Sequence, residues 1–269
     1  MNFSNIILNW YAINGRELPW RQTTDPYAIW LSEVIMQQTK IAQGTAYWER
    51  FIKRWPNVQS LANATEDEVL REWQGLGYYS RARNLHKAAQ QIVDLGYFPQ
   101  TYNELIQLKG IGEYIAAAVY SIAFAGPVAV VDGNVYRVLA RFFGIETPID
   151  STQGKKIFKA IAQDNLPKNA PAAYNQGIMD FGAMQCTPTL PNCKVCPLIE
   201  YCFAANNNKV SSLPVKIKKT KQRERHFSYI YIRCKGKTAI RRRGKGDIWQ
   251  GLWAVSYTHL RAHETVLDL

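Results

Sequence analysis

A succession of helical patterns fills the first three quarters of the 269-residue chain, and this feature most constrains the fold. Apolar residues recur at the spacing of one helix face, and no comparable alternating strand pattern interrupts them. No internal repeat relates the segments, so we expect an irregular, mainly α fold rather than a solenoid. The predicted helices are 25–39, 66–73, 80–95, 113–123, 134–143 and 155–163.

The pattern changes beyond residue 215. Residues 216–225 (KIKKTKQRER) carry six basic side chains and almost nothing apolar, which predicts an exposed linker over 216–226. From Phe227 onward, apolar and polar residues alternate as they do in strands. About forty residues can form a hairpin or two but rarely an independent core, so we expect an incomplete second domain.

The charge balance favours a polyanionic partner. The chain has 33 Lys plus Arg against 21 Asp plus Glu, a formal net charge of +12. An excess of this size is typical of nucleic-acid binding, although many basic proteins are merely soluble. No apolar stretch reaches the roughly 20 residues of a membrane helix, and the first residues lack the pattern of an export signal. We therefore expect a soluble protein with no membrane contact.

Four cysteines lie within 17 residues, at Cys186, Cys193, Cys196 and Cys202. Such a loop can close around one metal centre without long-range folding. Zinc sites usually show two separated C-x2-C pairs, whereas one pair flanked by single cysteines favours an iron–sulfur cluster. Disulfides or buried thiols are the alternatives, and Cys234 is most simply a packed thiol.

Two glycines, Gly110 and Gly112, lie between two predicted helices. They allow a tight turn that presents unhindered N–H groups at a helix start, where phosphate oxygens bind. A plain interhelical turn is the alternative. A second glycine-containing turn, 75–83, combines adjacent tyrosines with two arginines and predicts a wedge between DNA bases, or else a packed turn.

Two carboxylates are candidates for acid–base chemistry. The Asp25-Pro26 helix start places Glu33 one turn from apolar Ile29 and Met36, so its pKa should be raised unless it is simply a surface glutamate. Asp132 precedes a predicted helix, where the dipole favours an anion and an ordinary N-cap is an equal explanation. One proton donor and one anion are what cleavage of a glycosidic bond requires.

The segments WLSEVIMQQT (30–39) and VDGNV (131–135), the glycine hairpin and the cysteine spacing together resemble the adenine-specific mismatch DNA glycosylases of the helix-hairpin-helix, endonuclease III superfamily. The resemblance spans about residues 5–255. It implies a mainly α, two-lobed body over 1–215, with a six-helix lobe at 25–130 and an iron–sulfur lobe from 1–24 plus 131–215. Residues 227–255 would begin a Nudix-like 8-oxoguanine-recognition domain. Residues 256–269 match nothing expected and suggest a truncation or foreign tail.

The resemblance also assigns roles to residues. Glu33 would protonate N7 of adenine, Asp132 would stabilise the sugar cation, and Tyr114 and Asn134 would support the Asp132 carboxylate and the intermediate. A structural 4Fe-4S cluster would be held by Cys186, Cys193, Cys196 and Cys202. The residues expected to contact substrate or DNA are Arg16, Trp20, Arg21, Gln38, Leu76, Tyr78, Gly110, Gly112 and Gln176, with Asp180 as a nearby structural acid.

The expected activity is monofunctional hydrolysis of adenine from A:8-oxoG or A:G mispairs in double-stranded DNA. Bifunctional relatives carry a Schiff-base lysine where this chain has Tyr114. The incomplete C-terminal domain should weaken the preference for 8-oxoguanine. A bifunctional lyase and a non-catalytic iron–sulfur DNA-binding protein are the alternatives, and a zinc deaminase lacks its H-x-E motif. The resemblance implies a monomer in the bacterial-type cytoplasm, associated with the nucleoid.

Overall fold

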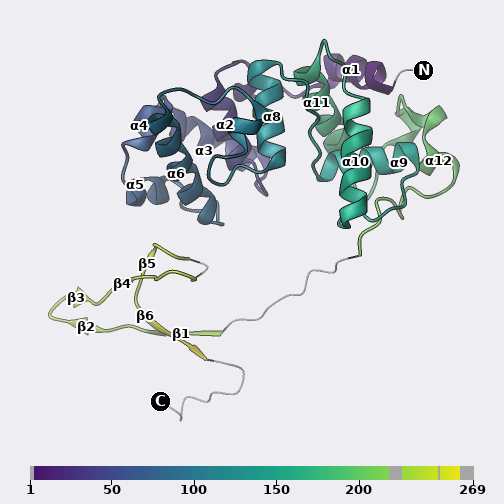
Figure 1. Ribbon diagram of the computed structural model, residues 1–269. Coiled ribbons are helices and arrows are strands. Elements are labelled where there is room, and N and C mark those ends of the chain that lie inside the picture. The colour runs from purple at the N-terminus through teal and green to yellow at the C-terminus, as the bar shows by residue number, and fades with distance from the viewer. Residues whose placement is uncertain (1–2, 218–225, 248, 261–269) are drawn as a thin grey trace.

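The computed structural model describes residues 3–217, 226–247 and 249–260 (Figure 1). Helices form two lobes, and a small region of short strands follows them. The long helices are α1 (Phe3–Asn14), α2 (Pro26–Ile35), α3 (Ile41–Arg54), α5 (Glu66–Glu72), α6 (Ser80–Leu95), α8 (Glu113–Phe124), α9 (Gly133–Phe143), α10 (Thr152–Asp164) and α11 (Pro171–Asp180). Shorter ones are α4 (Val58–Ala62), α7 (Tyr102–Leu105) and α12 (Phe203–Asn206).

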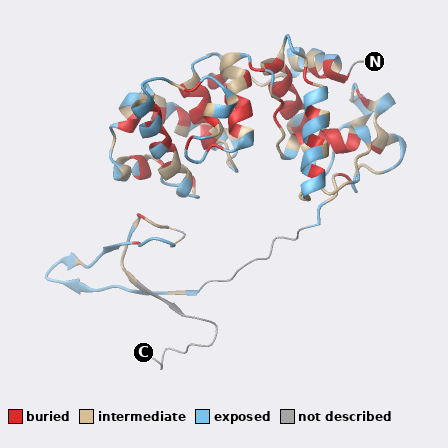
Figure 2. Cartoon of the chain, viewed as in Figure 1, coloured by how far each residue is buried: buried red, intermediate tan, exposed pale blue. Residues whose placement is uncertain are grey.

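The first lobe is built around large aromatic side chains. Trp30 of α2, Phe51 of α3 and Trp73 after α5 are fully buried, and the rings of Phe51 and Trp73 meet edge to face at 5.9 Å. Figure 2 shows the buried faces of these helices turned toward one another. Leu18 and Trp20, from the segment expected to belong to the second lobe, also pack in this core.

The second lobe joins the two ends of the helical body. Helix α1 packs on α11, so that Ile7 shares a core with Phe158 of α10 and with Tyr174. Helix α8 belongs to both cores: Ile115 faces the first, whereas Ala117 faces the second. A helix that is apolar on nearly all sides must be buried by two partners, and this double burial joins the lobes.

Local sequence signals explain where the helices begin. Asp25 caps α2 by accepting a hydrogen bond from the backbone N–H of Tyr27, and Asp132 caps α9, as the sequence predicts. A reciprocal capping box between Thr65 and Glu68 starts α5. The predicted bounds of α6 are confirmed, those of α8, α9 and α10 differ by up to three residues, and α2 ends at Ile35, four residues early.

The C-terminal strands form two-stranded antiparallel pairs. β1 (His226–Ile230) pairs with β6 (Ser256–Leu260), β2 (Arg233–Cys234) with β3 (Lys237–Thr238), and β4 (Arg241–Arg242) with β5 (Trp253–Ala254). The first residues of the atypical tail are thus a strand, paired from His226↔Leu260 to Ile230↔Ser256. The rest of the tail, most of the expected linker (218–225) and Ile248 lie outside the described residues.

The strand region contacts the first lobe. Arg242 forms an ion pair with Asp67 of α5 at 2.6 Å, and Arg83 of α6 donates to the backbone oxygen of Gln250. Leu252 packs against the first core. Among the residues that the structure describes, no helix is long and apolar enough to cross a bilayer.

Gly154 provides a test of the packing around α10. Replacing a helical glycine by alanine ordinarily stabilises a helix by up to about 1 kcal/mol. Here a Cβ would overlap the backbone carbonyl oxygen of Pro148, which cannot move as a side chain could. We expect Gly154→Ala to lower the free energy of unfolding by about 1–3 kcal/mol in urea denaturation. The exposed neighbour variant Gln153→Ala should not lower it, and equal stability of both variants would contradict the prediction.

Candidate active site

One cavity of about 550 Å³ contains both predicted carboxylates. It lies between the lobes, with walls from the end of α2, the start of α6, the start of α8 and the N-terminus of α9. Glu33, Asp132 and Tyr114 line it, as do Gln38 and Tyr78 at its rim. The cavity could therefore admit a nucleobase between an acid from one lobe and an acid from the other.

Glu33 is held in surroundings that favour its protonated form. Burial raises the pKa of its carboxyl group, and the nearby charge of Asp132 adds to the increase. Two neighbours lower the pKa of Glu33. The Tyr114 hydroxyl donates a hydrogen bond to Glu33 Oε2 at 2.7 Å, and the positive charge of Arg21 favours the carboxylate. The net shift is upward, as the sequence predicts for a carboxyl group with apolar neighbours.

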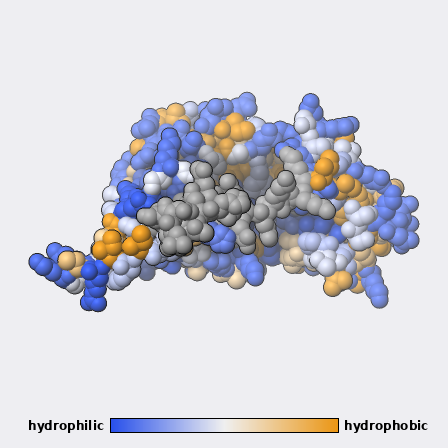
Figure 3. Space-filling view, turned by 90° about the horizontal axis from the view of Figure 1, so that it is seen from below, coloured by the Kyte–Doolittle hydropathy of each residue, from blue (hydrophilic) through white to orange (hydrophobic). Residues whose placement is uncertain are grey.

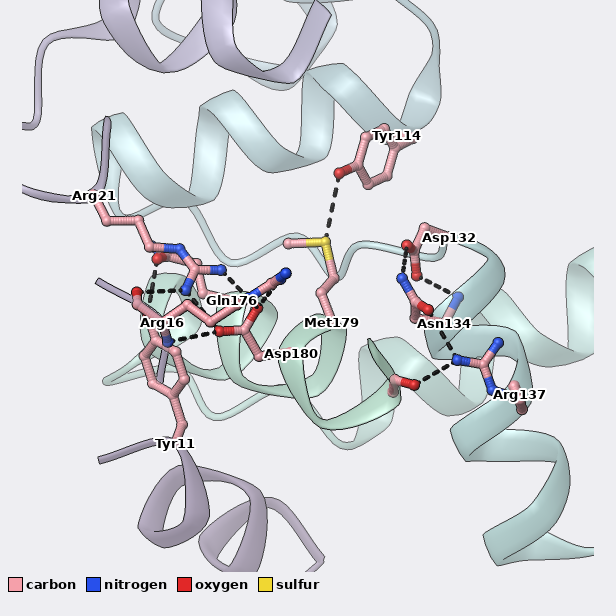
Figure 4. Close-up of polar contacts among 11 residues, drawn as sticks. Tyr11, Arg16, Arg21, Tyr114, Asp132, Asn134, Arg137, Gln176, Met179 and Asp180 are labelled. Carbon is pink, nitrogen blue, oxygen red and sulfur yellow. Dashed lines mark hydrogen bonds and ion pairs between the residues drawn. The ribbon is translucent and has the colours of Figure 1, made fainter. Parts of the chain in front are cut away.

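Asp132 occupies the N-cap position of α9 (Figure 4). Its Oδ1 accepts hydrogen bonds from the backbone N–H groups of Asn134 at 2.9 Å and Val135 at 2.8 Å, and Oδ2 accepts one from the Asn134 amide at 2.8 Å. Burial raises the pKa of Asp132, and the three hydrogen bonds act against that rise. Both carboxyl groups are thus desolvated, but Asp132 accepts three hydrogen bonds, whereas Glu33 accepts one from Tyr114.

Asn134 connects this cap to a buried arginine. The guanidinium of Arg137 donates to Asn134 Oδ1 at 2.9 Å and, through Nε, to the backbone oxygen of Cys186 at 2.7 Å. The amide of Asn134 is therefore oriented with its nitrogen toward Asp132 (Figure 4). The sequence predicts a supporting role for Asn134 but gives no sign of Arg137.

A second polar cluster contains the residues predicted to border the adenine pocket. The carboxylate of Asp180 is fully buried and accepts from Arg21 at 2.7 Å and from Arg16 Nε at 2.9 Å (Figure 4). Burial alone would raise the pKa of Asp180, but these ion pairs outweigh burial and lower it. The arginines thus hold the N-terminal segment onto α11. Gln176, one turn before Asp180, is buried and bonded to the hydroxyl of Tyr11 at 2.9 Å.

Two residues at the rim of the cavity have a left-handed backbone conformation. Gln38 has φ 53° and Tyr78 has φ 44°, and the Tyr78 side chain is 66% exposed. Residues other than glycine adopt this conformation at a cost, and such strain gathers at functional sites. Leu76, predicted to contact DNA, is instead buried in the first core, and Trp20 is buried beside Trp48.

Arg81 joins the two rim segments. One nitrogen of its guanidinium donates to the backbone oxygen of Val34, in the last turn of α2, and to that of Gln37, just after α2. The other nitrogen donates to the backbone oxygen of Leu76. The sequence suggests that the arginines of this turn hold DNA, but Arg81 is bound inside the protein. Trp73 adds a hydrogen bond from its indole to the Gly77 oxygen at 2.9 Å.

The glycine hairpin precedes α8. Gly110 has φ 78°, and a Cβ there would lie 2.6 Å from Cβ of Asn84, so glycine is required on both grounds. Gly112 is the N-cap residue and supplies no side-chain acceptor to the first turn of α8. The backbone N–H groups in the first turn of α8 are therefore available to bind an anion.

The four clustered cysteines are free thiols that lie near one another, since each of the others raises the pKa of Cys196. Burial is the larger cause and brings that pKa to about 11. Arg141 approaches Cys186 Sγ at 3.4 Å. In the described part of the chain, no group of three or more Cys, His, Asp or Glu side chains is arranged to hold a metal ion.

Sequence reasoning did not single out Tyr11, Arg137 and Met179, and it included Arg81 only in the turn predicted to wedge between DNA bases. Met179 brings its sulfur to 3.5 Å from the Tyr114 hydroxyl. Each of these side chains contacts a partner that is distant in the sequence, from 44 residues for Arg81 and Gln37 to 165 for Tyr11 and Gln176, although Arg81 and Arg137 also bond to residues within five positions. No local motif could have found them.

Comparison with known proteins agrees with this geometry. Residues 31–164 match the family model of the HhH-GPD superfamily base excision DNA repair proteins. An adenine DNA glycosylase of Buchnera aphidicola (from Schizaphis graminum) is 36% identical over 254 residues, which cover 93% of this chain and 73% of the relative. Human adenine DNA glycosylase is 40% identical over 213 residues, covering 75% of this chain and 39% of that protein.

Solved structures show the same fold. A thermostable thymine-DNA glycosylase superposes with a TM-score of 0.71 at 27% identity, covering 76% of this chain and 95% of that one. An endonuclease III in a non-covalent DNA complex gives a TM-score of 0.65 at 22% identity, covering 76% and 94%. The expected helix-hairpin-helix glycosylase fold is thus confirmed. The chain belongs to the adenine DNA glycosylases, within the helix-hairpin-helix superfamily of base excision DNA repair proteins.

Proposed function

We propose that this chain hydrolyses the N-glycosidic bond of adenine mispaired with 8-oxoguanine or guanine in double-stranded DNA. The observation that supports it most is that Glu33 and Asp132 line the same cavity, with Tyr114 bonded to the first. A base can reach such a cavity only when it is rotated out of the duplex. Tyr78 and Gln38 stand at the rim, where they could fill the space that the base leaves.

The two carboxyl groups divide the chemistry. Glu33, whose pKa is raised by burial, donates its proton to N7 of the extruded adenine. The C1′–N9 bond then breaks, and its electron pair leaves with the base. Asp132 in its ionised form, oriented by its three hydrogen bonds, stabilises the positive charge on deoxyribose until a water attacks C1′ and loses its proton. Tyr114 orients the Glu33 carboxyl group, and Asn134 that of Asp132.

The lining of the cavity favours hydrolysis without strand cleavage. A lyase needs an amine that forms a Schiff base with the sugar. Among the described residues, none that lines the cavity is a lysine, and Tyr114 stands where bifunctional relatives carry theirs. The bifunctional lyase is therefore the less favoured activity.

Incubation with a duplex containing A opposite 8-oxoG should give strand breaks only after alkali.

The remaining assignments complete the proposal. Gly110 and Gly112 would bind a DNA phosphate at the start of α8, and Gln176 would contact the adenine. The four clustered thiols suit a structural 4Fe-4S cluster, which spaces its ligands more widely than a single zinc ion does. The strands after residue 226 would belong to a Nudix-like 8-oxoguanine-recognition domain. We propose that the protein acts as a monomer in the cytoplasm, on the nucleoid.

Replacing the proton donor should separate catalysis from binding. Glu33→Gln keeps the shape of the side chain but cannot give up a proton, so single-turnover adenine release should fall at least about 100-fold. Fluorescence anisotropy on the same duplex should show unchanged affinity. Glu49→Gln, at an exposed position of α3, is the matched control and should retain full activity. Undiminished release by Glu33→Gln would refute the assignment and favour a non-catalytic DNA-binding protein.

The pH profile should report both carboxyl groups. Release requires Glu33 protonated and Asp132 ionised. The rate should therefore fall when the pH rises above the raised pKa of Glu33, and it should also fall when the pH drops below the raised pKa of Asp132. The Tyr114 hydrogen bond lowers the pKa of Glu33, so Tyr114→Phe should raise it and move the alkaline limb to higher pH. A shift to lower pH would contradict this.

Iron content tests the cysteine cluster. Protein purified without oxygen should contain about four iron atoms per chain, with the visible absorption of an iron–sulfur cluster. Cys196→Ser removes one of the clustered thiols and should reduce both signals. The matched control is Cys234→Ser, at an exposed cysteine in β2, which should leave both unchanged. Zinc in place of iron would refute the cluster assignment.

A further inference from the structure

A second cavity, of about 590 Å³, shares Tyr114 with the catalytic cavity. It lies between the two lobes, with Tyr102 of α7 and the start of α8 on one side and α9 and α10 on the other. Figure 1 shows α8 and α10 facing each other there. We call it the α10 groove and define it by Tyr102, Tyr136, Lys155, Lys156 and Lys159.

The floor of the groove is apolar. Ala117 of α8 and Val131, the residue before Asp132, contribute to it. Tyr136 is held in place by an edge-to-face contact with Phe158 at 5.0 Å between ring centroids. Small aliphatic side chains and fixed aromatic rings suit sugar and base faces, which bury apolar surface, better than they suit a free ion.

The rim toward α10 is strongly basic. Lys155 and Lys159 are one helical turn apart, roughly 5–6 Å between Cβ atoms, and Lys156 adjoins them. Within the described segments, no ion pair involves Lys155 or Lys156. Lys159 pairs with Glu113 of α8 at 3.1 Å, and both side chains are more than half exposed. Three cations against one carboxylate, spread along a helix, match a chain of phosphates rather than one anion.

The groove also continues a surface that the proposed function already uses. Glu113 directly follows Gly112, the hairpin residue at the start of α8. Tyr114, the next residue, separates the groove from the catalytic cavity that would hold the extruded nucleotide. A DNA strand with one phosphate at the hairpin and one sugar at Asp132 would therefore pass the mouth of the groove.

We propose that the α10 groove binds the sugar–phosphate backbone of the DNA strand that carries the extruded nucleotide. Lys155 and Lys156 contact its phosphates, and Lys159 exchanges Glu113 for a phosphate when DNA binds. This inference rests on the proposed function and adds a DNA-contacting surface to the same site. Part of the binding affinity thus comes from α10, which contains none of the motifs found in the sequence.

The test measures equilibrium binding to a duplex with a tetrahydrofuran abasic-site analogue opposite 8-oxoguanine, over a range of KCl concentrations. This duplex has no base to remove, so binding is read independently of catalysis. Lys155→Ala/Lys156→Ala should weaken binding and reduce the slope of log Kd against log salt by about one unit per lysine. Lys53→Ala/Lys87→Ala, with the same change in charge at exposed positions of α3 and α6, should leave that slope unchanged.

Glu113→Gln should change the DNA affinity in the opposite direction. It removes the carboxylate that competes with DNA phosphates for Lys159, so the protein should bind the duplex more tightly. An unchanged slope for the α10 double variant, or weaker binding by Glu113→Gln, would overturn the proposal. Lys155→Gln/Lys156→Gln repeats the test with longer side chains, and thermal unfolding followed by circular dichroism verifies that each variant folds. If the parent protein releases no adenine, the proposed function fails while the salt slopes still decide the groove.

Discussion

The packing of α8 into both hydrophobic cores is the constraint on which the site depends. Ile115 is buried in one core and Ala117 in the other, so the first turns of this helix cannot move relative to either lobe. Tyr114 lies between them and donates to Glu33 of the first lobe. Asp132, at the start of α9, lines the same cavity as Glu33 and Tyr114.

The three carboxyl groups near the site, those of Asp180, Asp132 and Glu33, have different hydrogen-bond and ion-pair partners. Asp180 is paired with two arginines, which hold it ionised and secure the N-terminal segment to α11. Asp132 has backbone and amide donors but no ion pair. Glu33 has one tyrosine hydroxyl, and its pKa stays raised. Two charged donors lower the pKa of Asp180, whereas the neutral donors of Glu33 and Asp132 leave the pKa of each raised by burial. Figure 3 shows hydrophilic side chains over much of the face seen from below.

The sequence alone determined the local elements of this protein. Helix periodicity and caps such as Asp25 and Asp132 predicted α2, α5, α6, α8, α9 and α10, because these signals act within one or two turns. The long helices α1, α3 and α11 were not predicted. The hairpin glycines followed from backbone sterics, and the structure gives Gly110 the left-handed φ that only glycine adopts easily. The motifs around Glu33 and Asp132 pointed to glycosidic chemistry, and the family comparison agrees with that activity.

Only the tertiary structure decided which of these elements meet. It placed Glu33 and Asp132 in one cavity, buried Leu76, turned Arg81 inward to join the two rim segments, and brought Tyr11 and Arg137 to residues far away in the chain. The pairing of β1 with the first residues of the tail was equally unforeseen. A local pattern fixes which face of a helix is apolar, but not which partner covers that face. Contacts between distant segments depend on how whole helices pack, and that is set by the summed burial of both cores.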